Sequence, residues 1–200
     1  MMKFAVAATA ALAPLLANAA PSVGAPAPDF SGVTSSGETI SLSQFRGETV
    51  VLEWTNDGCP FVQKHYETGN MQATQGVVNE AGGVWITVIS SAPGKQGHAS
   101  PARADELTTS RGAAPDYVLL DESGDVGRAY AAKTTPHMFV VDGEGALRYA
   151  GAIDDKPSAN HASVDGATNY ALAAFNSVVA GDGVKVQETK PYGCSVKYGS

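Results

Sequence analysis

The feature that most constrains this chain is a cysteine that lies directly between a buried strand and a helix. Residues 49–54 (TVVLEW) are mostly apolar, as expected for a strand covered on both faces of a parallel sheet. A short loop and the pair Cys59-Pro60 follow, and a helical pattern then runs to about residue 81, with an interruption expected at Gly69. Proline is favoured at the first position of a helix, so Pro60 there makes Cys59 the expected N-cap.

Cys59 is expected to be reactive because of its place at the start of that helix. Free backbone N–H groups and the positive end of the helix dipole stabilise a thiolate at a helix N-terminus. A lowered pKa makes the thiol a nucleophile near neutral pH. A buried cysteine can also act as a small apolar side chain, but the position between strand and helix favours a reactive thiol.

The composition excludes several classes of function. The chain carries 13 Lys and Arg against 20 Asp and Glu, a net charge of −7, and its basic residues form no cluster. A nucleic-acid partner or an anionic membrane surface requires clustered positive charge. Two cysteines are too few for a disulfide scaffold or a four-thiolate zinc site. The chain has four histidines: His65, His98, His137 and His161. Their spacing is not that of metal ligands, so the sequence predicts no metal and no cofactor.

The remaining pattern alternates strands with helices. Further strands are expected at 84–89, 117–120 and in a hairpin of 137–141 with 146–150, and further helices at 101–110, 127–132 and 167–180. This alternation predicts a single α/β domain over residues 20–200, with helices on both faces of a central sheet. An irregular C-terminal tail, residues 184–198, carries the second cysteine, Cys194.

Residues 1–19 differ in character from the rest of the chain. Lys3 is their only charge, a largely apolar run follows at 4–16, and Ala17-Asn18-Ala19 forms a small-x-small ending. This pattern is typical of a secretory signal peptide, here cleaved after Ala19, whereas a membrane anchor needs roughly 20 apolar residues. We therefore expect a periplasmic or secreted protein that is free of the membrane after cleavage. In that compartment two cysteines can persist as a disulfide.

Three segments, VVLEWTNDGCPFV, TTPHMFVVDGEGALRYAGAIDD and PYGCSVKY, carry a family resemblance. Together they resemble the redoxin branch of the thioredoxin-like superfamily and its secreted, peroxiredoxin-like (AhpC/TSA-like) members, over residues 24–198. The resemblance implies a thioredoxin-like fold with a central mixed sheet. It places Cys59 at the first cysteine of the CxxC motif and Pro136 as the cis-proline that faces it. Thr135, Pro136 and Pro60 are then the expected substrate-binding residues.

The chain also departs from the patterns of that superfamily. The motif reads Cys59-Pro60-Phe61-Val62, so the helix lacks the second cysteine of CxxC. This excludes a thioredoxin-type reductase that closes its disulfide within the motif. The Pro-x-x-x-Thr-x-x-Cys motif of true peroxiredoxins is also absent. The resemblance therefore does not carry peroxidase activity over to this chain.

Glu53 is a second candidate catalytic residue. It stands in an otherwise apolar strand, six residues before Cys59. The resemblance implies a buried acid at this spacing, which moves a proton to and from the active-site thiol. Burial raises the pKa of a carboxyl and suits it to general acid–base catalysis. The alternative is a surface glutamate in an ordinary ion pair.

Cys194 has two possible roles. It could resolve an intermediate on Cys59, or it could form a permanent disulfide with Cys59. Closing so long a loop would stabilise the fold by roughly 5 kcal/mol in the chain-entropy model. The residues leave both roles open.

The sequence thus predicts an exported thiol-disulfide oxidoreductase that acts through Cys59, with Cys194 and Glu53 as further catalytic residues. Its partner would be a thiol or disulfide protein, or a small oxidant that Cys59 attacks. One alternative is a non-catalytic binding module with a permanent Cys59–Cys194 disulfide. The other is a copper-handling protein, in which His137 would lie close enough to reach Cys59.

Overall fold

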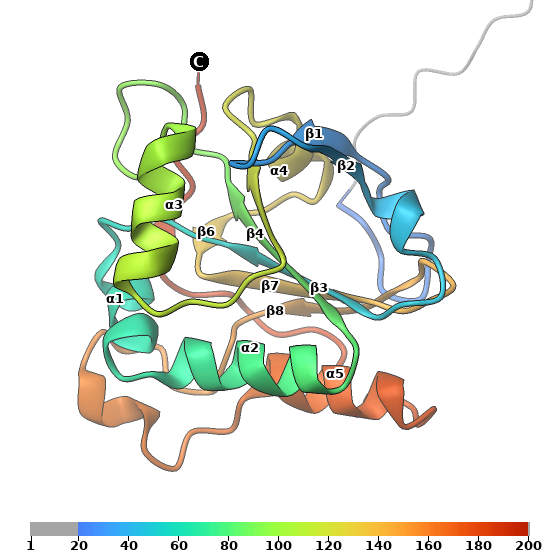
Figure 1. Cartoon of the computed structure of the whole chain (residues 1–200). Coiled ribbons are helices and arrows are strands. Elements are labelled where there is room, and N and C mark those ends of the chain that lie inside the picture. The colour runs from blue at the N-terminus through green and yellow to red at the C-terminus, as the bar shows by residue number, and fades with distance from the viewer. Residues whose placement is uncertain (1–19, 200) are drawn as a thin grey trace, which may run out of the picture.

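The centre of the molecule is a five-stranded mixed sheet (Figure 1). The computed structural model describes residues 20–199, in which this sheet has the strand order β5-β4-β3-β7-β8. Its strands are β3 (Val50–Trp54), β4 (Val84–Ile89), β5 (Tyr117–Leu120), β7 (His137–Val141) and β8 (Leu147–Gly151). Strands β3, β4 and β5 are parallel, β7 is antiparallel to β3, and β8 is antiparallel to β7. Because β3 is central, all five of its residues are buried.

Helices cover one face of the sheet, and a hairpin with a short helix covers the other (Figure 1). The helices on the first face are α1 (Pro60–Glu67), α2 (Asn70–Glu80), α3 (Pro101–Ser110) and α5 (Tyr170–Val179). The second face carries β1 (Ser31–Val33), β2 (Thr39–Ser41), the 3-10 helix η1 (Leu42–Phe45) and α4 (Asp125–Ala129). A second 3-10 helix, η2 (His161–Val164), precedes α5, and two short strands, β6 (Thr134–Thr135) and β9 (Cys194–Ser195), pair separately.

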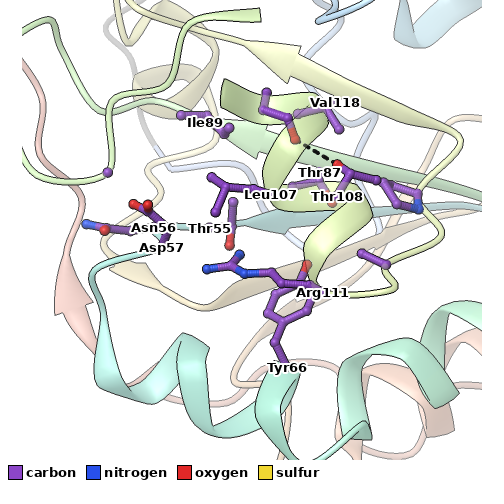
Figure 2. A pocket seen from close by; sticks show the side chains of 14 residues that line it. Thr55, Asn56, Asp57, Tyr66, Thr87, Ile89, Leu107, Thr108, Arg111 and Val118 are labelled. Carbon is purple, nitrogen blue, oxygen red and sulfur yellow. Dashed lines mark hydrogen bonds between the residues drawn. The ribbon is translucent and has the colours of Figure 1, made fainter. Parts of the chain in front are cut away.

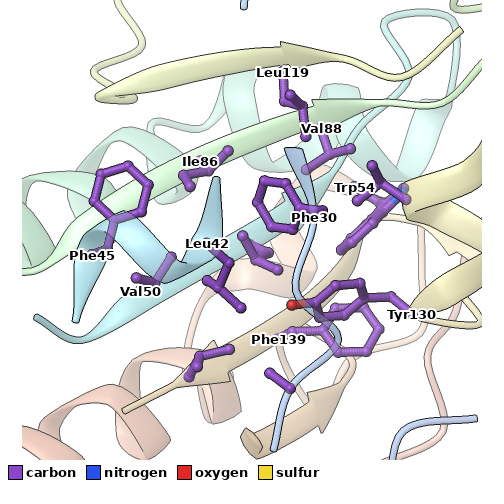
Figure 3. Packing of buried hydrophobic residues seen from close by; sticks show 14 of the residues in the cluster. Phe30, Leu42, Phe45, Val50, Trp54, Ile86, Val88, Leu119, Tyr130 and Phe139 are labelled. Atoms are coloured by element: carbon purple, nitrogen blue, oxygen red, sulfur yellow. The ribbon is translucent and has the colours of Figure 1, made fainter. Parts of the chain in front are cut away.

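The two faces of the sheet bury two separate cores. The hairpin-side core, shown in Figure 3, includes Phe30, Leu42, Phe45, Trp54, Leu119, Tyr130 and Phe139. The helix-side core includes Cys59, Val62, Tyr66, Met71, Trp85, Met138 and Phe175. Successive strand residues point to opposite faces, which is why Trp54 belongs to the first core and Val51 to the second.

The structure confirms the predicted fold class and corrects some element boundaries. The helical stretch expected over residues 60–81 is interrupted at Gly69, as predicted, because Gly69 adopts a left-handed conformation with φ +74° between two helices. Helix α5 begins at Tyr170, later than expected, because the Asn169 side chain accepts a hydrogen bond from Leu172 N and caps the helix there. The tail is not wholly irregular, since Cys194 and Ser195 form β9.

The predicted signal peptide, residues 1–19, lies outside the described residues. Within residues 20–199, no helix combines the length and the apolar character needed to cross a bilayer.

Candidate functional site

Cys59 lies where the sequence predicts, at the N-cap of α1. Its backbone is extended, with φ −87° and ψ 119°, and Pro60 occupies the first turn. Asn56 shapes the preceding loop, because its side-chain oxygen accepts from Gly58 N at 2.9 Å and its carbonyl accepts from Cys59 N at 3.1 Å. The Cys59 side chain is fully buried. The loop and the helix start thus hold the thiol at the edge of the helix-side core.

Thr135 and Pro136 lie against Cys59, although they are far from it in sequence. The Cys59 thiol donates a hydrogen bond to the Thr135 carbonyl oxygen at 3.0 Å. The Thr135–Pro136 peptide bond is cis, and Pro136 leads directly into β7, the neighbour of β3. The ends of β3 and β7 therefore bring these three residues together.

The C-terminal tail brings Cys194 to the same place. Strand β9 pairs antiparallel with β6, and in this register Cys194 lies opposite Thr135. Gly193 allows the close approach: its φ is +133°, and a Cβ atom there would overlap the Thr135 carbonyl oxygen. Both cysteines are free thiols, Cys59 buried and Cys194 half-buried. The structure thus brings together, as free thiols, two cysteines that are far apart in the sequence.

The two thiols have opposite pKa shifts. Burial acts to raise the pKa of Cys59, but hydrogen bonds from the Cys194 thiol and from the backbone N–H groups of Cys194 and Val62 outweigh it and lower the pKa. Burial, and then the hydrogen bond and charge of Cys59, raise the pKa of Cys194 to about 11. Cys59 is therefore the group that ionises first, and the Cys194 thiol donates to it. Val62 N belongs to the first turn of α1, as expected for a thiolate stabilised by a helix N-terminus.

Glu53 is buried, but the structure does not place it in contact with Cys59. Its carboxylate accepts hydrogen bonds from Tyr66 OH at 2.9 and 3.0 Å, from Trp85 Nε1 at 3.1 Å and from Thr87 Oγ1 at 3.2 Å. Burial raises its pKa above the usual value of 4.5, against the effect of these three donors. The surface ion pair that was the alternative is excluded.

A narrow cavity lies next to the Glu53 network, and neither cysteine lines it. Figure 2 shows its lining residues. It has a volume of about 20 Å³, room for about one water molecule. Tyr66 and Thr87, two donors to Glu53, line it, and the Arg111 guanidinium lies 4.6 Å from the centre of the Tyr66 ring. The hydroxyl oxygen of Thr55, another lining residue, is buried with no hydrogen-bond partner among the described residues.

A cluster of buried polar side chains lies beside Cys194 and was not predicted from the sequence. Lys64 Nζ and Asp154 Oδ2 are 3.7 Å apart, and both side chains are almost completely buried. Tyr192, two residues before Cys194, donates its hydroxyl to Asp154 and lies 3.2 Å from His65 Nε2. Asp154 is buried because Lys64 and Tyr192 cover it.

The other histidines do not approach Cys59. His137 lies on the hairpin side, with its ring 4.4 Å from that of Phe139, whereas Cys59 belongs to the helix-side core. The expectation that His137 could reach Cys59 is therefore wrong, because β7 turns its side chain to the opposite face. His98 and His161 form partly exposed pairs with Glu122 and Glu67. Among residues 20–199, no three His, Cys, Asp or Glu side chains are grouped closely enough to hold a metal ion.

Comparison with known proteins places this architecture in a family. The profile of the AhpC/TSA family matches residues 23–150. Comparison with curated protein sequences gives no match.

Several solved structures share the fold. A hypothetical protein from Sinorhizobium meliloti has a TM-score of 0.75 and 23% identity, over 91% of this chain and 97% of that one. An uncharacterised conserved protein from Geobacillus kaustophilus has a TM-score of 0.73 and 22% identity, over 89% and 93% of the two chains. The thioredoxin domain of a thiol-disulfide oxidoreductase from Bacteroides vulgatus has a TM-score of 0.52 and 21% identity, over 72% and 96%. These similarities show a thioredoxin-like fold, as predicted.

Proposed function

The chain belongs to the AhpC/TSA family, and from that premise we propose that it is an exported thiol-disulfide oxidoreductase. Cys59 is the nucleophile, and Cys194 is the resolving cysteine. The mature protein is the domain from residue 20 onwards, after removal of residues 1–19 as a signal peptide. It acts in the periplasm or outside the cell on a thiol or disulfide partner, or on a small oxidant. The thioredoxin-like fold that it shares with the Bacteroides vulgatus oxidoreductase domain is compatible with this role.

The observation that carries the proposal is the pair of free thiols that the pairing of β6 with β9 brings together at the start of α1. Cys59 has a lowered pKa, and Cys194 is the first of the side-chain partners that lower it. In a permanent disulfide neither sulfur is a thiolate, so a lowered pKa of Cys59 would have no function. A nucleophilic cysteine acts as the thiolate and requires such a lowered pKa. Thr135 fixes the direction of the Cys59 thiol through its carbonyl oxygen.

The reaction follows from the order in which the two thiols ionise. The Cys59 thiolate attacks one sulfur of a substrate disulfide, forms a mixed disulfide and releases the other substrate sulfur as a thiolate. This step removes the negative charge on Cys59, which is one cause of the raised pKa of Cys194. Cys194 then loses its proton more readily, attacks Cys59 and releases the second substrate thiol. Two electrons and two protons pass from the protein dithiol to the substrate, and an external dithiol restores the protein.

The remaining candidate residues have supporting roles in this scheme. Pro60 sets the start of α1, and Thr135 and Pro136 bound the position that a substrate segment would take beside Cys59. Glu53 acts at most indirectly, because its hydrogen bonds go to Tyr66, Trp85 and Thr87.

The test compares two serine variants with the same chemical change. Reduced mature protein is given oxidised glutathione, and turnover is followed with dithiothreitol as the reductant. We expect Cys59→Ser to abolish turnover above the uncatalysed rate, and Cys194→Ser, treated with oxidised glutathione before any dithiothreitol is added, to accumulate a glutathione adduct on Cys59 that mass spectrometry detects. Turnover that survives Cys59→Ser, or the absence of an adduct in Cys194→Ser, contradicts the proposal.

The reduction potential of the pair separates this proposal from a structural disulfide. Equilibration in glutathione buffers should give a value between roughly −120 and −270 mV, the range of exchange proteins. A value below about −300 mV indicates a structural bond and favours a binding module.

A further inference from the structure

The tail covers the nucleophile that the proposed function requires to be accessible. Cys59 has no exposed surface, and the chain that lies over it includes Tyr192 and Cys194, which pack against the helix-side core. Strand β9 also occupies the hydrogen-bonding edge of β6, next to Cys59. An extended substrate segment needs that same edge to pair with the backbone of Thr135. Tail and substrate cannot occupy it together.

Tyr192 is the side chain that fixes this part of the tail. Its single hydroxyl proton is donated to Asp154 Oδ1. Its oxygen then accepts from Lys64 Nζ at 3.3 Å and from His65 Nε2 at 3.2 Å. The phenol ring packs on Phe61, with 5.7 Å between ring centres. One hydroxyl thus meets three ionisable side chains that are themselves buried.

In this cluster Lys64 and His65 both donate hydrogen bonds to the phenol oxygen of Tyr192. Burial, and then the charge of Lys64, lower the pKa of His65 to about 4, so the imidazole is neutral at pH 7. Because Nε2 donates to Tyr192, Nδ1 is left as an acceptor, and the Asn70 amide lies 2.7 Å from it. Lys64 Nζ makes its other hydrogen bonds to Lys156 O at 3.1 Å and Ser163 Oγ at 3.4 Å. These contacts hold the Lys64 and His65 donors in place around the phenol oxygen.

We propose that Lys64, His65 and Asp154 form a tyrosine-binding site that latches the tail over Cys59. In the latched state the tail takes the place of a substrate segment on β6. A substrate gains access to Cys59 only when Tyr192 leaves this site and β9 separates from β6; the start of α1, with Val62 N, then stabilises the Cys59 thiolate until Cys194 returns to resolve the mixed disulfide. The proposal rests on the proposed function for its purpose, but the latch itself can be measured without any turnover.

The rest of the tail is held independently of Tyr192, so its release can be local. On one side, Ala150 N donates to Gln187 O at 3.1 Å and Thr189 N donates to Ala150 O at 3.2 Å, along the edge of β8. On the other side, Tyr198 OH donates to Ala132 O at 2.8 Å. The segment between these two anchors contains Tyr192, Gly193 and Cys194. Opening of this segment alone uncovers the thiol.

The test measures how readily iodoacetamide reaches Cys59 in the reduced, full-length mature chain. Alkylation of Cys59 is followed by mass spectrometry across a pH series, so that the plateau rate at high pH reports access and the midpoint reports the pKa. Tyr192→Phe keeps the ring on Phe61 and removes the hydroxyl. We expect the plateau rate to rise about tenfold or more. The variant loses the hydrogen bonds between the hydroxyl and charged groups that stabilise the latched state, so the tail opens more often.

Tyr130→Phe is the matched control. Tyr130 is also a buried tyrosine, and its hydroxyl donates to Pro28 O at 2.9 Å on the hairpin side, in the core on the other face of the sheet from Cys59. Its plateau rate should equal that of the unchanged protein. A rise of less than roughly threefold in Tyr192→Phe, beyond that of Tyr130→Phe, overturns the latch.

A second measurement uses the unchanged protein and does not depend on how a variant folds. Alkylation of Cys59 is repeated in increasing urea below the unfolding transition. Local opening of the tail exposes little surface, so the rate should depend on urea far more weakly than global unfolding does. An equal dependence means that Cys59 is reached only by unfolding the domain, which overturns the latch. The serine variants can still succeed in that case, so the two proposals fail separately.

Discussion

The two cores on either side of the sheet differ in the partners of their buried charged side chains. On the hairpin side, aromatic rings pack on one another: Trp54 lies 5.1 Å from Phe139 and 5.3 Å from Tyr130 between ring centres (Figure 3). The buried carboxylate beside this core, Asp121, accepts from the backbone N–H groups at the start of α4. It also accepts from the Ser90 hydroxyl at 2.6 Å, so backbone and hydroxyl donors satisfy its charge without a charged partner.

The helix side buries its charges against distant parts of the chain. Lys64 and His65 of α1 meet Asp154, which follows β8, and Tyr192, which lies in the tail. Buried ion pairs often add little net stability, because desolvation offsets their attraction. Here the cluster instead fixes the position of the tail, because Tyr192 binds only at this one place. One face of the sheet therefore stabilises the domain, whereas the other face arranges its thiols.

The largest expected effect comes from breaking the buried pair on the helix side. Lys64→Met or Asp154→Asn alone leaves one buried group without its partner, and each should lower the free energy of unfolding by about 3–5 kcal/mol. The double variant should lose much less than the sum of the two, because neither charge remains. Urea unfolding of the four proteins measures this coupling.

Phe45→Ala tests the role of the hairpin-side core. Phe45 is buried in the hairpin-side core, and its truncation should also remove about 3–5 kcal/mol. The pKa of Cys59 should stay unchanged in this variant. A shift of that pKa in Phe45→Ala, or simple additivity of the two helix-side changes, would contradict the division of roles between the faces.

A smaller effect is expected at Gly193, where the tail meets β6. Gly193→Ala forces a side chain into a left-handed backbone and against the Thr135 carbonyl, which should lower the free energy of unfolding by about 1–3 kcal/mol. The tail should move away, so Cys59 loses its hydrogen bonds from Cys194 and its pKa rises towards the usual value of 9.0. Ultraviolet absorbance of the thiolate across a pH titration measures this shift.

Gly183→Ala provides the control for that variant. Gly183 lies just before the tail, and a Cβ atom there would meet no atom within 4 Å. Its stability and its Cys59 pKa should match those of the unchanged protein. An unshifted Cys59 pKa in Gly193→Ala would mean that the helix start alone lowers it.

The part of the site around Cys59 could be predicted because its signals are local. An apolar strand, a short loop and a Cys-Pro pair specify an N-cap wherever they occur, and the structure places Cys59 there. The α/β class follows from the same alternation of strands and helices. Burial of Glu53 could not be derived from periodicity alone, because a central strand is buried on both faces regardless of its pattern.

The placement of the tail could not be predicted, because its contacts are long-range. Tyr192 lies 128 residues from Lys64 and 127 from His65 in the sequence. Strand β9 has only two residues, which is too short for any alternating pattern. Lys64 and His65 in α1 were a possible signal of a buried polar cluster. Nothing in their spacing shows which residue they bind.

The smallest expected effect concerns Glu53 and depends on pH. The pKa of Glu53 is raised in the folded protein above its usual value of 4.5, so between these two values folding takes up a proton. Its contribution to stability is therefore complete below about pH 4.5 and is lost as the pH rises through the folded pKa. The slope is at most about 1.4 kcal/mol per pH unit.

Glu53→Gln isolates this contribution, because all other titrating groups remain. The amide oxygen can still accept from Trp85 and Thr87, and its charge no longer changes. The difference in unfolding free energy between the unchanged protein and the variant should move in favour of the variant as pH rises above 4.5. Urea unfolding at several pH values measures it. A difference that does not vary with pH would mean that Glu53 stays ionised in the fold. Glu53 would then be a fixed acceptor for Tyr66, Trp85 and Thr87, without a proton to exchange with the thiol site.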